Sequence, residues 1–389
     1  MSGEETTKES KTPSANKFII IRILISLTFL AISIYIAITL ISGRGFNFDW
    51  FTDLLYPNER GVIVDEMNFN IGRSKVFADL NNAIAAAGSL GIQVINFEGS
   101  ETLRESFSMN SPAISYSNGF AIAFDIGGTE ARVFNSNEVF ASISTNGPIV
   151  SASINPNRWF TINAQEGEGY RGTTTVYNDI GIPVYRVSLA SGYILTSALS
   201  YDNNSLAILN LTEYGSRITF YHDLNKEHDD GALDFPDCLV LDISFLPNGD
   251  LLTITSESII IIDPFVYSRW EIINFADLRI GGYAISDDYI ALHLLDFGIG
   301  HKGKLIIIDH FGNLYGEIAI DRELISMSLT NDYLSVMLGD GLVLLDRSLT
   351  ILPSIDESPS AAGVSQVLSL DIGATLIAGD RFAVILDSP

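Results

Sequence analysis

Eight short apolar runs, each ending in Asn, Asp or His, recur along the chain and constrain its fold more than any other feature. A further strand-like run and a turn precede each copy, as in LDISFLPNGD-LLTITS-ESIIIID-PFVYSR-WEIINF, which indicates four strands per repeat. A period of about 40 residues with four strands is typical of a β-propeller blade. The sequence therefore predicts an all-β, eight-bladed propeller, or seven blades if one run is an extra strand. The runs end, 37 to 46 residues apart, at Asn96, Asn135, Asn178, His222, Asp263, Asp309, Asp346 and Asp387.

The last repeat is incomplete, because only Ser388 and Pro389 follow its third predicted strand, FAVILD. Its fourth strand must come from elsewhere in the chain. Gly61–Phe69 (GVIVDEMNF) precedes the first complete repeat and has no other partner. We predict that it pairs at the outer edge of the eighth blade, closes the ring and covers an edge that would otherwise promote aggregation.

The composition is that of a folded domain with a large core. Charged residues make up 18% of the 389 residues and hydrophobic ones 47%, with 32 glycines and 12 prolines. The single cysteine, Cys238, excludes an intramolecular disulfide and any multi-cysteine metal site. Its apolar surroundings predict a buried side chain without a chemical role.

The formal net charge of −25 restricts the choice of partners. A domain this acidic repels phosphate backbones, so we predict no nucleic acid partner. Cationic ligands, basic proteins and Ca²⁺ remain compatible with the charge.

One apolar segment near the N-terminus predicts a membrane anchor. Phe18–Ile41 holds 24 residues with one charge, Arg22, close enough to the end to reach the headgroups. It is longer than the core of a signal peptide and no small-residue cleavage site follows it. Four basic residues lie at or before its start, so the positive-inside rule predicts a cytoplasmic N-terminus.

The expected organisation is a single-pass protein of the cell membrane with most of the chain on the extracytoplasmic side. It comprises a cytoplasmic tail (1–17), a transmembrane helix (18–41), a juxtamembrane linker (42–60) and the propeller domain (61–389). Aromatic residues in the linker suit either the headgroup layer or packing on the domain.

Two stretches imitate phosphate-binding loops. Asp125–Thr129 (DIGGT) resembles the first phosphate loop of actin-like ATPases and sugar kinases, but here it joins two strands of one repeat rather than opening an α/β domain. Gly298–Leu305 (GIGHKGKL) is close to a Walker A loop, yet Leu305 replaces the Mg²⁺-binding hydroxyl and a strand follows instead of a helix. We predict hairpin turns at both places, and neither a nucleotide nor any other cofactor.

Metal-ligating residues are densest in YHDLNKEHDDGALD, residues 221–234. Asp223, Asn225 and Glu227 imitate the start of a calcium loop, but His228 stands where the turn glycine belongs. We predict a solvated loop at a blade edge and no metal. His293 and His310 are predicted to be structural residues with satisfied hydrogen bonds.

Long connections between second and third strands mark a candidate binding face. They are NAQEGEGYRG in blade three, NLTEYGSR in blade four and LDFGIGHKGK in blade six, which all open on one rim of a propeller. Aromatic residues and charges of both signs suit contacts with a protein. The candidate residues are Glu166, Glu168, Tyr170, Arg171, Tyr214, Arg217, Asp296, His301 and Lys302.

The stretches NGPIVSASINPNRWFTINAQEGEGYRGTTTVYN, ILTSALSYDNNSLAIL and LVLDISFLPNGDLLTITSESIIIID resemble an uncharacterised family of Gram-positive bacteria, a membrane-anchored domain of unknown function. The resemblance covers most of the chain after residue 60. It implies a single span followed by a propeller, and it implies no activity and no site residues.

Together these features predict a binding or scaffold module at the cell envelope, with a protein partner and no enzymatic activity. The alternative is an extracytoplasmic hydrolase or lyase with carboxylates in the central channel, where Asp242 is the one acidic residue in a suitable register. A sensor whose cytoplasmic tail reports binding is a third possibility.

Overall fold

The computed structural model of the protein describes residues 66–167, 169–224, 231–298, 300–352 and 361–387. The predicted tail, membrane helix and linker (residues 1–60) lie outside the described residues, as do Gly61–Asp65. Among the residues that are described, no helix is long and apolar enough to cross a membrane.

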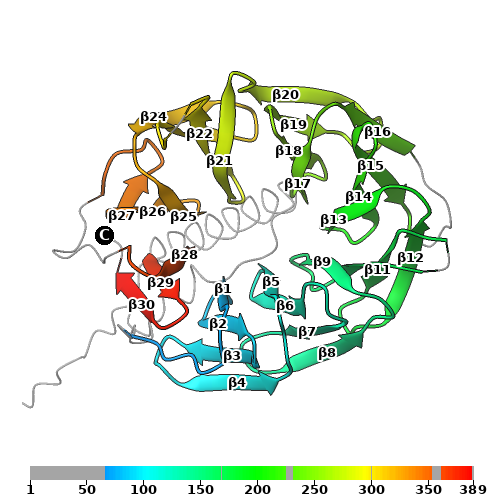
Figure 1. Cartoon of the computed structure of the whole chain (residues 1–389), viewed down its shortest axis with the longest axis horizontal. Helices are drawn as coiled ribbons and strands as arrows, with labels where there is room; N and C mark the ends of the chain where they lie inside the picture. The colour runs from blue at the N-terminus through cyan, green and yellow to red at the C-terminus, as the bar shows by residue number, and fades with distance from the viewer. Residues whose placement is uncertain (1–65, 168, 225–230, 299, 353–360, 388–389) are drawn as a thin grey trace, which may run out of the picture. The chain divides into compact units, whose positions relative to one another are not determined.

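Strands β1 to β30 form eight antiparallel sheets that stand around a central axis like the blades of a propeller (Figure 1). Blade one holds β1 (Val76–Asp79), β2 (Ala83–Gly88), β3 (Gly91–Asn96) and β4 (Glu101–Ser106); blade two holds β5 (Pro112–Ser117), β6 (Phe120–Asp125), β7 (Glu130–Phe134) and β8 (Val139–Ser144). Blade three holds β9 (Ile149–Ile154), β10 (Phe160–Ala164), β11 (Gly172–Tyr177) and β12 (Pro183–Leu189); blade four holds β13 (Tyr193–Leu199), β14 (Ser205–Thr212), β15 (Gly215–His222) and β16 (Gly231–Pro236).

The second half of the chain continues the pattern, except that in the described residues the sheets of blades seven and eight have three strands instead of the predicted four. Blade five holds β17 (Val240–Phe245), β18 (Leu251–Thr255), β19 (Ser258–Ile262) and β20 (Arg269–Asn274); blade six holds β21 (Leu278–Ile285), β22 (Tyr289–Asp296), β23 (Gly303–Asp309) and β24 (Leu314–Ile320). Blade seven holds β25 (Leu324–Leu329), β26 (Tyr333–Leu338) and β27 (Gly341–Asp346); blade eight holds β28 (Val364–Leu370), β29 (Ala374–Gly379) and β30 (Ala383–Asp387). The eight-bladed prediction is confirmed, and each of the eight apolar runs forms the third strand of its blade.

The polar residue that ends most of these third strands shapes the turn into the fourth strand. The Asn96 side-chain oxygen accepts the Ser100 amide at 2.7 Å, and Asp309 Oδ1 accepts the amides of Phe311 and Asn313, both at 2.9 Å. Asn and Asp favour such turns because a short side-chain oxygen can bind backbone N–H groups ahead of it. The sequence repeat therefore marks a repeated turn as well as a repeated strand.

The core lies between blades rather than within them. Second strands such as β2, β26 and β29 are buried at every position, whereas the outer strand β4 alternates between exposed and partly buried residues. Among the described residues, each of eight apolar clusters combines side chains of two neighbouring blades, and one of them joins blade eight to blade one. A single blade could not bury its own faces.

The described end of the predicted closing segment pairs with blade eight. Glu66 forms an antiparallel bridge with Val384 of β30, and the Met67 amide donates to the Ala383 carbonyl at 2.8 Å. The Met67 and Ile71 side chains are buried against Leu376 and Ile385 in the cluster shared by blades eight and one. Chain segments from opposite ends of the domain therefore complete this blade.

We expect deletion of Gly61–Phe69 to cause aggregation or loss of cooperative unfolding, because it uncovers the β30 edge and removes buried apolar side chains. The measurements are thermal unfolding and size-exclusion chromatography. Glu66→Ala, which removes an exposed side chain and keeps the backbone pairing, is the control. A deletion variant with the parent's melting temperature and solubility would show that this segment is not needed for closure.

Candidate binding face

The antiparallel blades place their connections on two opposite faces of the ring. The 2–3 face carries the turns between second and third strands together with the segments that join successive blades. The 1–2 face carries the turns between first and second and between third and fourth strands. This arrangement follows from the alternating strand direction within each sheet.

The long connections predicted on the 2–3 face are present in blades three and six, but not in blade four. Residues 165–171 join β10 to β11, and residues 297–302 join β22 to β23. In blade four, eight-residue strands meet in a turn of only Glu213 and Tyr214, where the Thr212 hydroxyl donates to the Gly215 carbonyl at 2.9 Å. The prediction of an extended loop there was wrong, because the strands themselves are longer.

An exposed aromatic cluster lies on the 2–3 face of blades three and four. Tyr170, Tyr193 and Tyr214 keep 48%, 59% and 72% of their surface exposed. Arg171 Nη1 donates to the Tyr193 hydroxyl at 3.4 Å, and its guanidinium lies 5.5 Å from the centre of that ring. We name the tyrosine rim as the exposed residues Tyr170, Tyr193, Leu211, Tyr214 and Leu239.

Sequence reasoning missed Tyr193, Leu211 and Leu239. Tyr193 and Leu211 face each other as a cross-strand pair of β13 and β14. The available signal was an aromatic residue directly after Gly192, at the start of a strand.

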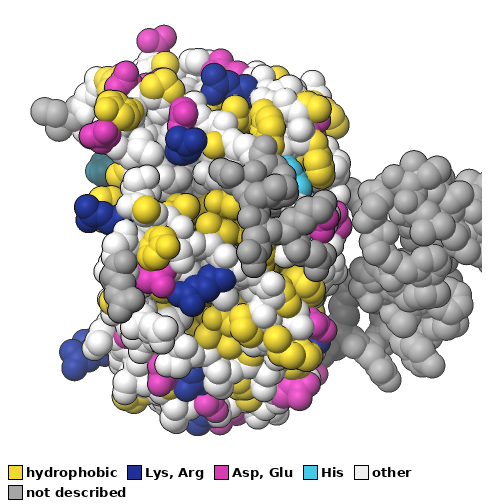
Figure 2. Space-filling model, turned by 90° about the vertical axis from the view of Figure 1, so that its right-hand side faces the viewer, with side chains coloured by type: hydrophobic (Ala, Val, Ile, Leu, Met, Phe, Trp, Pro, Cys, Tyr) yellow, Lys and Arg dark blue, Asp and Glu magenta, His cyan; other side chains and the backbone are white. Residues whose placement is uncertain are grey.

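The other predicted residues are dispersed. Glu166 turns into a cavity beside blade two, and Arg217 pairs with Asp234 at 3.5 Å along blade four. Asp296, His301 and Lys302 lie in and after β22 of blade six, beside the exposed Phe297. Glu168 lies outside the described residues. Of the predicted set, the structure therefore places Tyr170, Arg171 and Tyr214 on the 2–3 face of two adjacent blades. Figure 2 views the outer edge of the ring on the side of these blades, where hydrophobic and charged side chains are interspersed.

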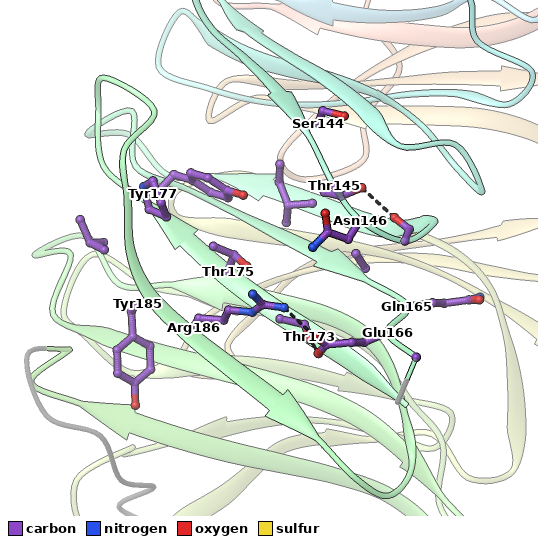
Figure 3. A pocket seen from close by; sticks show the side chains of 16 residues that line it. Ser144, Thr145, Asn146, Gln165, Glu166, Thr173, Thr175, Tyr177, Tyr185 and Arg186 are labelled. Atoms are coloured by element: carbon purple, nitrogen blue, oxygen red, sulfur yellow. Dashed lines mark hydrogen bonds and ion pairs between the residues drawn. The ribbon is translucent and has the colours of Figure 1, made fainter. Parts of the chain in front are cut away.

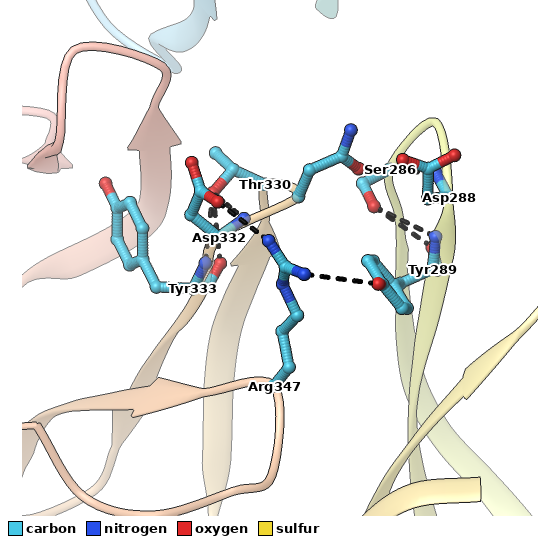
Figure 4. A network of polar contacts seen from close by, with 8 residues as sticks. Ser286, Asp288, Tyr289, Thr330, Asp332, Tyr333 and Arg347 are labelled. Atoms are coloured by element: carbon cyan, nitrogen blue, oxygen red, sulfur yellow. Dashed lines mark hydrogen bonds and ion pairs between the residues drawn. The ribbon is translucent and has the colours of Figure 1, made fainter.

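The 1–2 face is acidic. Among the described residues, the only Lys or Arg side chains on its turns are Arg158 and Arg347, which pair with Asp179 at 3.3 Å and Asp332 at 2.9 Å. Figure 4 shows Arg347 between Asp332 of blade seven and the Tyr289 hydroxyl of blade six, 3.3 Å away. The Asp288 amide also donates to the Asn331 side chain at 3.2 Å, so polar contacts hold these turns together.

Two acidic groups of the inner strands are unusual. Burial raises the pKa of Asp79, at the end of β1, to about 7; the Asn81 amide, which donates to it at 2.8 Å, lowers the pKa, and the nearby Asp371 charge raises it. Asp242 on β17 accepts a hydrogen bond from the Tyr283 hydroxyl at 3.1 Å, and burial raises its pKa too. The sequence singled out Asp242 but not Asp79.

The structure differs from the predictions made for two histidines and for the cysteine. Neither ring nitrogen of the buried His293 has a hydrogen-bond partner among the described residues, because the ring lies against Gly281 in an apolar setting, and burial lowers its pKa. The prediction of a satisfied histidine was wrong there, and it was wrong for Nε2 of His310 as well. Cys238 is only partly buried.

The loop after β15 shows no metal site in its described part. His222 Nδ1 contacts the Ser205 hydroxyl at 2.8 Å, Nε2 contacts the Pro264 carbonyl at 3.0 Å, and the ring stacks on Phe265 of blade five. No cluster of three metal-ligating residues occurs in the described ranges. Asn225, Glu227, His228, Asp229 and Asp230 lie outside them.

Both phosphate-loop imitations are strand connections, as predicted. Asp125–Thr129 spans the end of β6 and the turn before β7, and Asp125 Oδ1 accepts the amides of Asn110 and Ser111 at 2.8 and 2.7 Å. Asp125 therefore holds, through these two hydrogen bonds, the segment that joins blades one and two. Gly303–Leu305 already belongs to β23.

This geometry defines an eight-bladed β-propeller with an exposed aromatic cluster on one face and an acidic opposite face. Residues 61–348 match the family described as "Family of unknown function (DUF5711)", and the chain belongs to that family. No curated protein matches the chain.

Solved structures share the fold at low sequence identity. Saccharomyces cerevisiae Sqt1 is 12% identical with a TM-score of 0.60, covering 85% of this chain and 99% of Sqt1. The C-terminal WD40 domain of Sif2 is 13% identical with a TM-score of 0.57, covering 85% and 99%. BamB from Moraxella catarrhalis is 12% identical with a TM-score of 0.53, covering 84% and 97%. At such identities the likeness establishes the fold alone.

We expect Asp79→Asn to raise the melting temperature at pH 8 and to leave it unchanged at pH 4. The folded-state pKa of about 7 lies above the usual 3.8, so ionisation of Asp79 disfavours the folded state increasingly as the pH rises from about 4 to 7. The cost is at most about 4 kcal/mol at pH 8, where Asp79 is ionised in both states. Thermal unfolding across this pH range, with the exposed Asp321→Asn as control, measures the effect. Equal stabilisation at both pH values would contradict the assignment.

Proposed function

We propose that this chain is a binding module of the cell envelope, anchored in the membrane through Phe18–Ile41 and displaying its propeller outside the cell. On this proposal the tyrosine rim holds a protein partner, and the chain catalyses no reaction of its own.

The observation that carries the proposal is the gathering of Tyr170, Tyr193 and Tyr214 with Arg171 on two adjacent blades. Tyrosine and arginine are enriched among the residues that contribute most to protein interfaces. Exposed aromatic side chains that cluster, rather than scatter singly, mark interaction sites. Loops and strand ends that protrude from one face of a repeat fold commonly form its binding surface.

The central channel gives less support to a hydrolase or lyase. The carboxyl group of Asp242 is engaged by Tyr283, and Asp79 lies on a different blade at the end of its strand. A general acid and base need positions that converge on one substrate.

We expect Tyr193→Ala and Tyr214→Ala each to weaken partner binding by about 2 kcal/mol, roughly 30-fold, because each removes an aromatic anchor. The partner is first identified by photo-crosslinking from these two positions in intact cells, and its affinity is then measured with purified proteins. Phe311→Ala is the matched control, since Phe311 is 83% exposed but lies on the 1–2 face. A rim variant that binds like the parent, or a Phe311 variant that loses binding, would place the interface elsewhere.

We expect protease added to cells without their wall to release the propeller, because the basic residues before the span predict an extracytoplasmic domain. Immunoblotting with an antibody against the propeller reports the cleavage. Detergent-permeabilised cells show that the protease cuts the chain at all. Complete protection in intact cells together with cleavage after permeabilisation would rule out this topology.

A further inference from the structure

A cavity of about 490 Å³ lies between blades two and three, apart from the tyrosine rim (Figure 3). One wall is the end of β8 and the segment after it, Ser144–Gly147, and the other is the face of blade three formed by β10, β11 and β12. Its volume falls in the range of about 300–1,000 Å³ in which small-molecule sites are usually found. The cavity is therefore large enough to hold a small ligand.

The cavity lies where blade three carries a small polar residue and four of the other blades carry a large apolar one; blades one, two and four have Gln93, Arg132 and Thr219 there. Thr175 lies three residues before Asn178, the end of its third-strand run. At the same distance from the end of their runs, blades five to eight have Ile260, Ile306, Val343 and Val384. These aliphatic side chains face the preceding blade and pack against it in blades five to seven. Thr175 and the neighbouring Thr173 leave that space unfilled.

The charges inside the cavity are balanced. Arg186 Nη2 donates to Glu166 Oε1 at 2.6 Å, and Glu166 also accepts hydrogen bonds from Ser188, at 2.9 Å, and from Thr173. A charged ligand would give up part of its hydration in the cavity without meeting an unpaired opposite charge, which is unfavourable. The cavity is therefore suited to an uncharged ligand.

The remaining polar groups can both donate and accept hydrogen bonds. Figure 3 shows the Asn146 amide and the Tyr177 hydroxyl in the cavity with Thr175 and the Arg186 guanidinium. Hydroxyl and amide groups serve as donors and acceptors alike, and Arg186 has further N–H groups besides the one bound to Glu166. Burial raises the pKa of Tyr177, so its hydroxyl stays protonated at neutral pH. Ile162 and Val184 supply apolar surface between these groups.

We propose that this cavity is a binding site for a neutral, hydroxyl-rich ligand, namely one or two rings of an uncharged saccharide. Sugar hydroxyls match the mixed donors and acceptors, and the C–H faces of a sugar ring match the apolar surface. The proposal stands independently of the tyrosine rim, because the two sites share none of the residues on which their arguments rest.

The test titrates the full chain in a zwitterionic detergent without a sugar headgroup, using saturation-transfer NMR and calorimetry. The neutral probes are glucose, N-acetylglucosamine and di-N-acetylchitobiose, and the charged analogues are glucuronic acid and glucosamine. We expect at least one neutral probe to bind with a Kd of about 10 mM or tighter, and about tenfold tighter than the charged analogues.

Two substitutions connect binding to the cavity. Thr175→Ile inserts the side chain that blades five and six carry at this position, so it should fill the space and weaken binding more than tenfold. Thr175→Val replaces the hydroxyl group with a methyl group of similar size and remains informative if the larger side chain prevents folding. Thr219→Val is the matched control, because Thr219 holds the equivalent position in blade four and does not line the cavity.

The proposal predicts loss of binding in both Thr175 variants, with unchanged binding in Thr219→Val and in Tyr214→Ala. It is overturned if no neutral probe binds, if a charged analogue binds as tightly, or if folded Thr175 variants bind like the parent. Loss of partner binding in the rim variants with unchanged sugar binding would separate the two proposed sites.

Discussion

Closure of the ring is the constraint on which the rest of this structure depends. Every apolar cluster in the described residues is shared between two blades, so no blade can bury its faces unless both neighbours are in place. The contact of Glu66 and Met67 with β30 joins the two ends of the domain. The other neighbouring blades are consecutive in the sequence, so this junction alone depends on segments from opposite ends of the domain. Closure also removes a sheet edge that would otherwise remain unpaired.

Once the ring is closed, the connections between strands acquire two different environments. Short turns that contain Asn and Asp lie on the 1–2 face. They make this face acidic because Asp, one of the residues that favour tight turns, carries a negative charge. The connections on the 2–3 face are not all short turns of this kind. Longer strands and loops there expose tyrosine side chains. The different chemistry of the two faces thus follows from where each kind of turn falls in the repeat.

The space between blades offers a second way to vary a propeller without changing its fold. Blades five to eight fill the position equivalent to Thr175 with Ile or Val, whereas blade three leaves it polar and open. Between blades three and four, Asn163 instead bonds to Ser151, Ser197 and Thr174 at 2.6 to 2.9 Å and keeps that interface closed. Polar residues between blades can therefore either seal an interface or leave a cavity, and which occurs depends on whether partners lie within reach.

The sequence by itself determined the number of blades, the third strand of each, the turn that follows Asp125, the connection that ends before Gly303, and the origin of the closing segment. These features are periodic or local. Runs of β-branched residues, turn residues and a missing final strand can all be recognised in the linear sequence without knowledge of long-range contacts. The sequence also placed Tyr170, Arg171 and Tyr214 on one face, because strand counting assigns every connection to a side. Only the tertiary structure decided that Tyr193 and Leu211 join them, that Asp296 and His301 lie apart on blade six, and that Glu166 turns inward toward Arg186. Those outcomes depend on strand length, on cross-strand register and on contacts between residues distant in sequence, none of which a repeat pattern specifies.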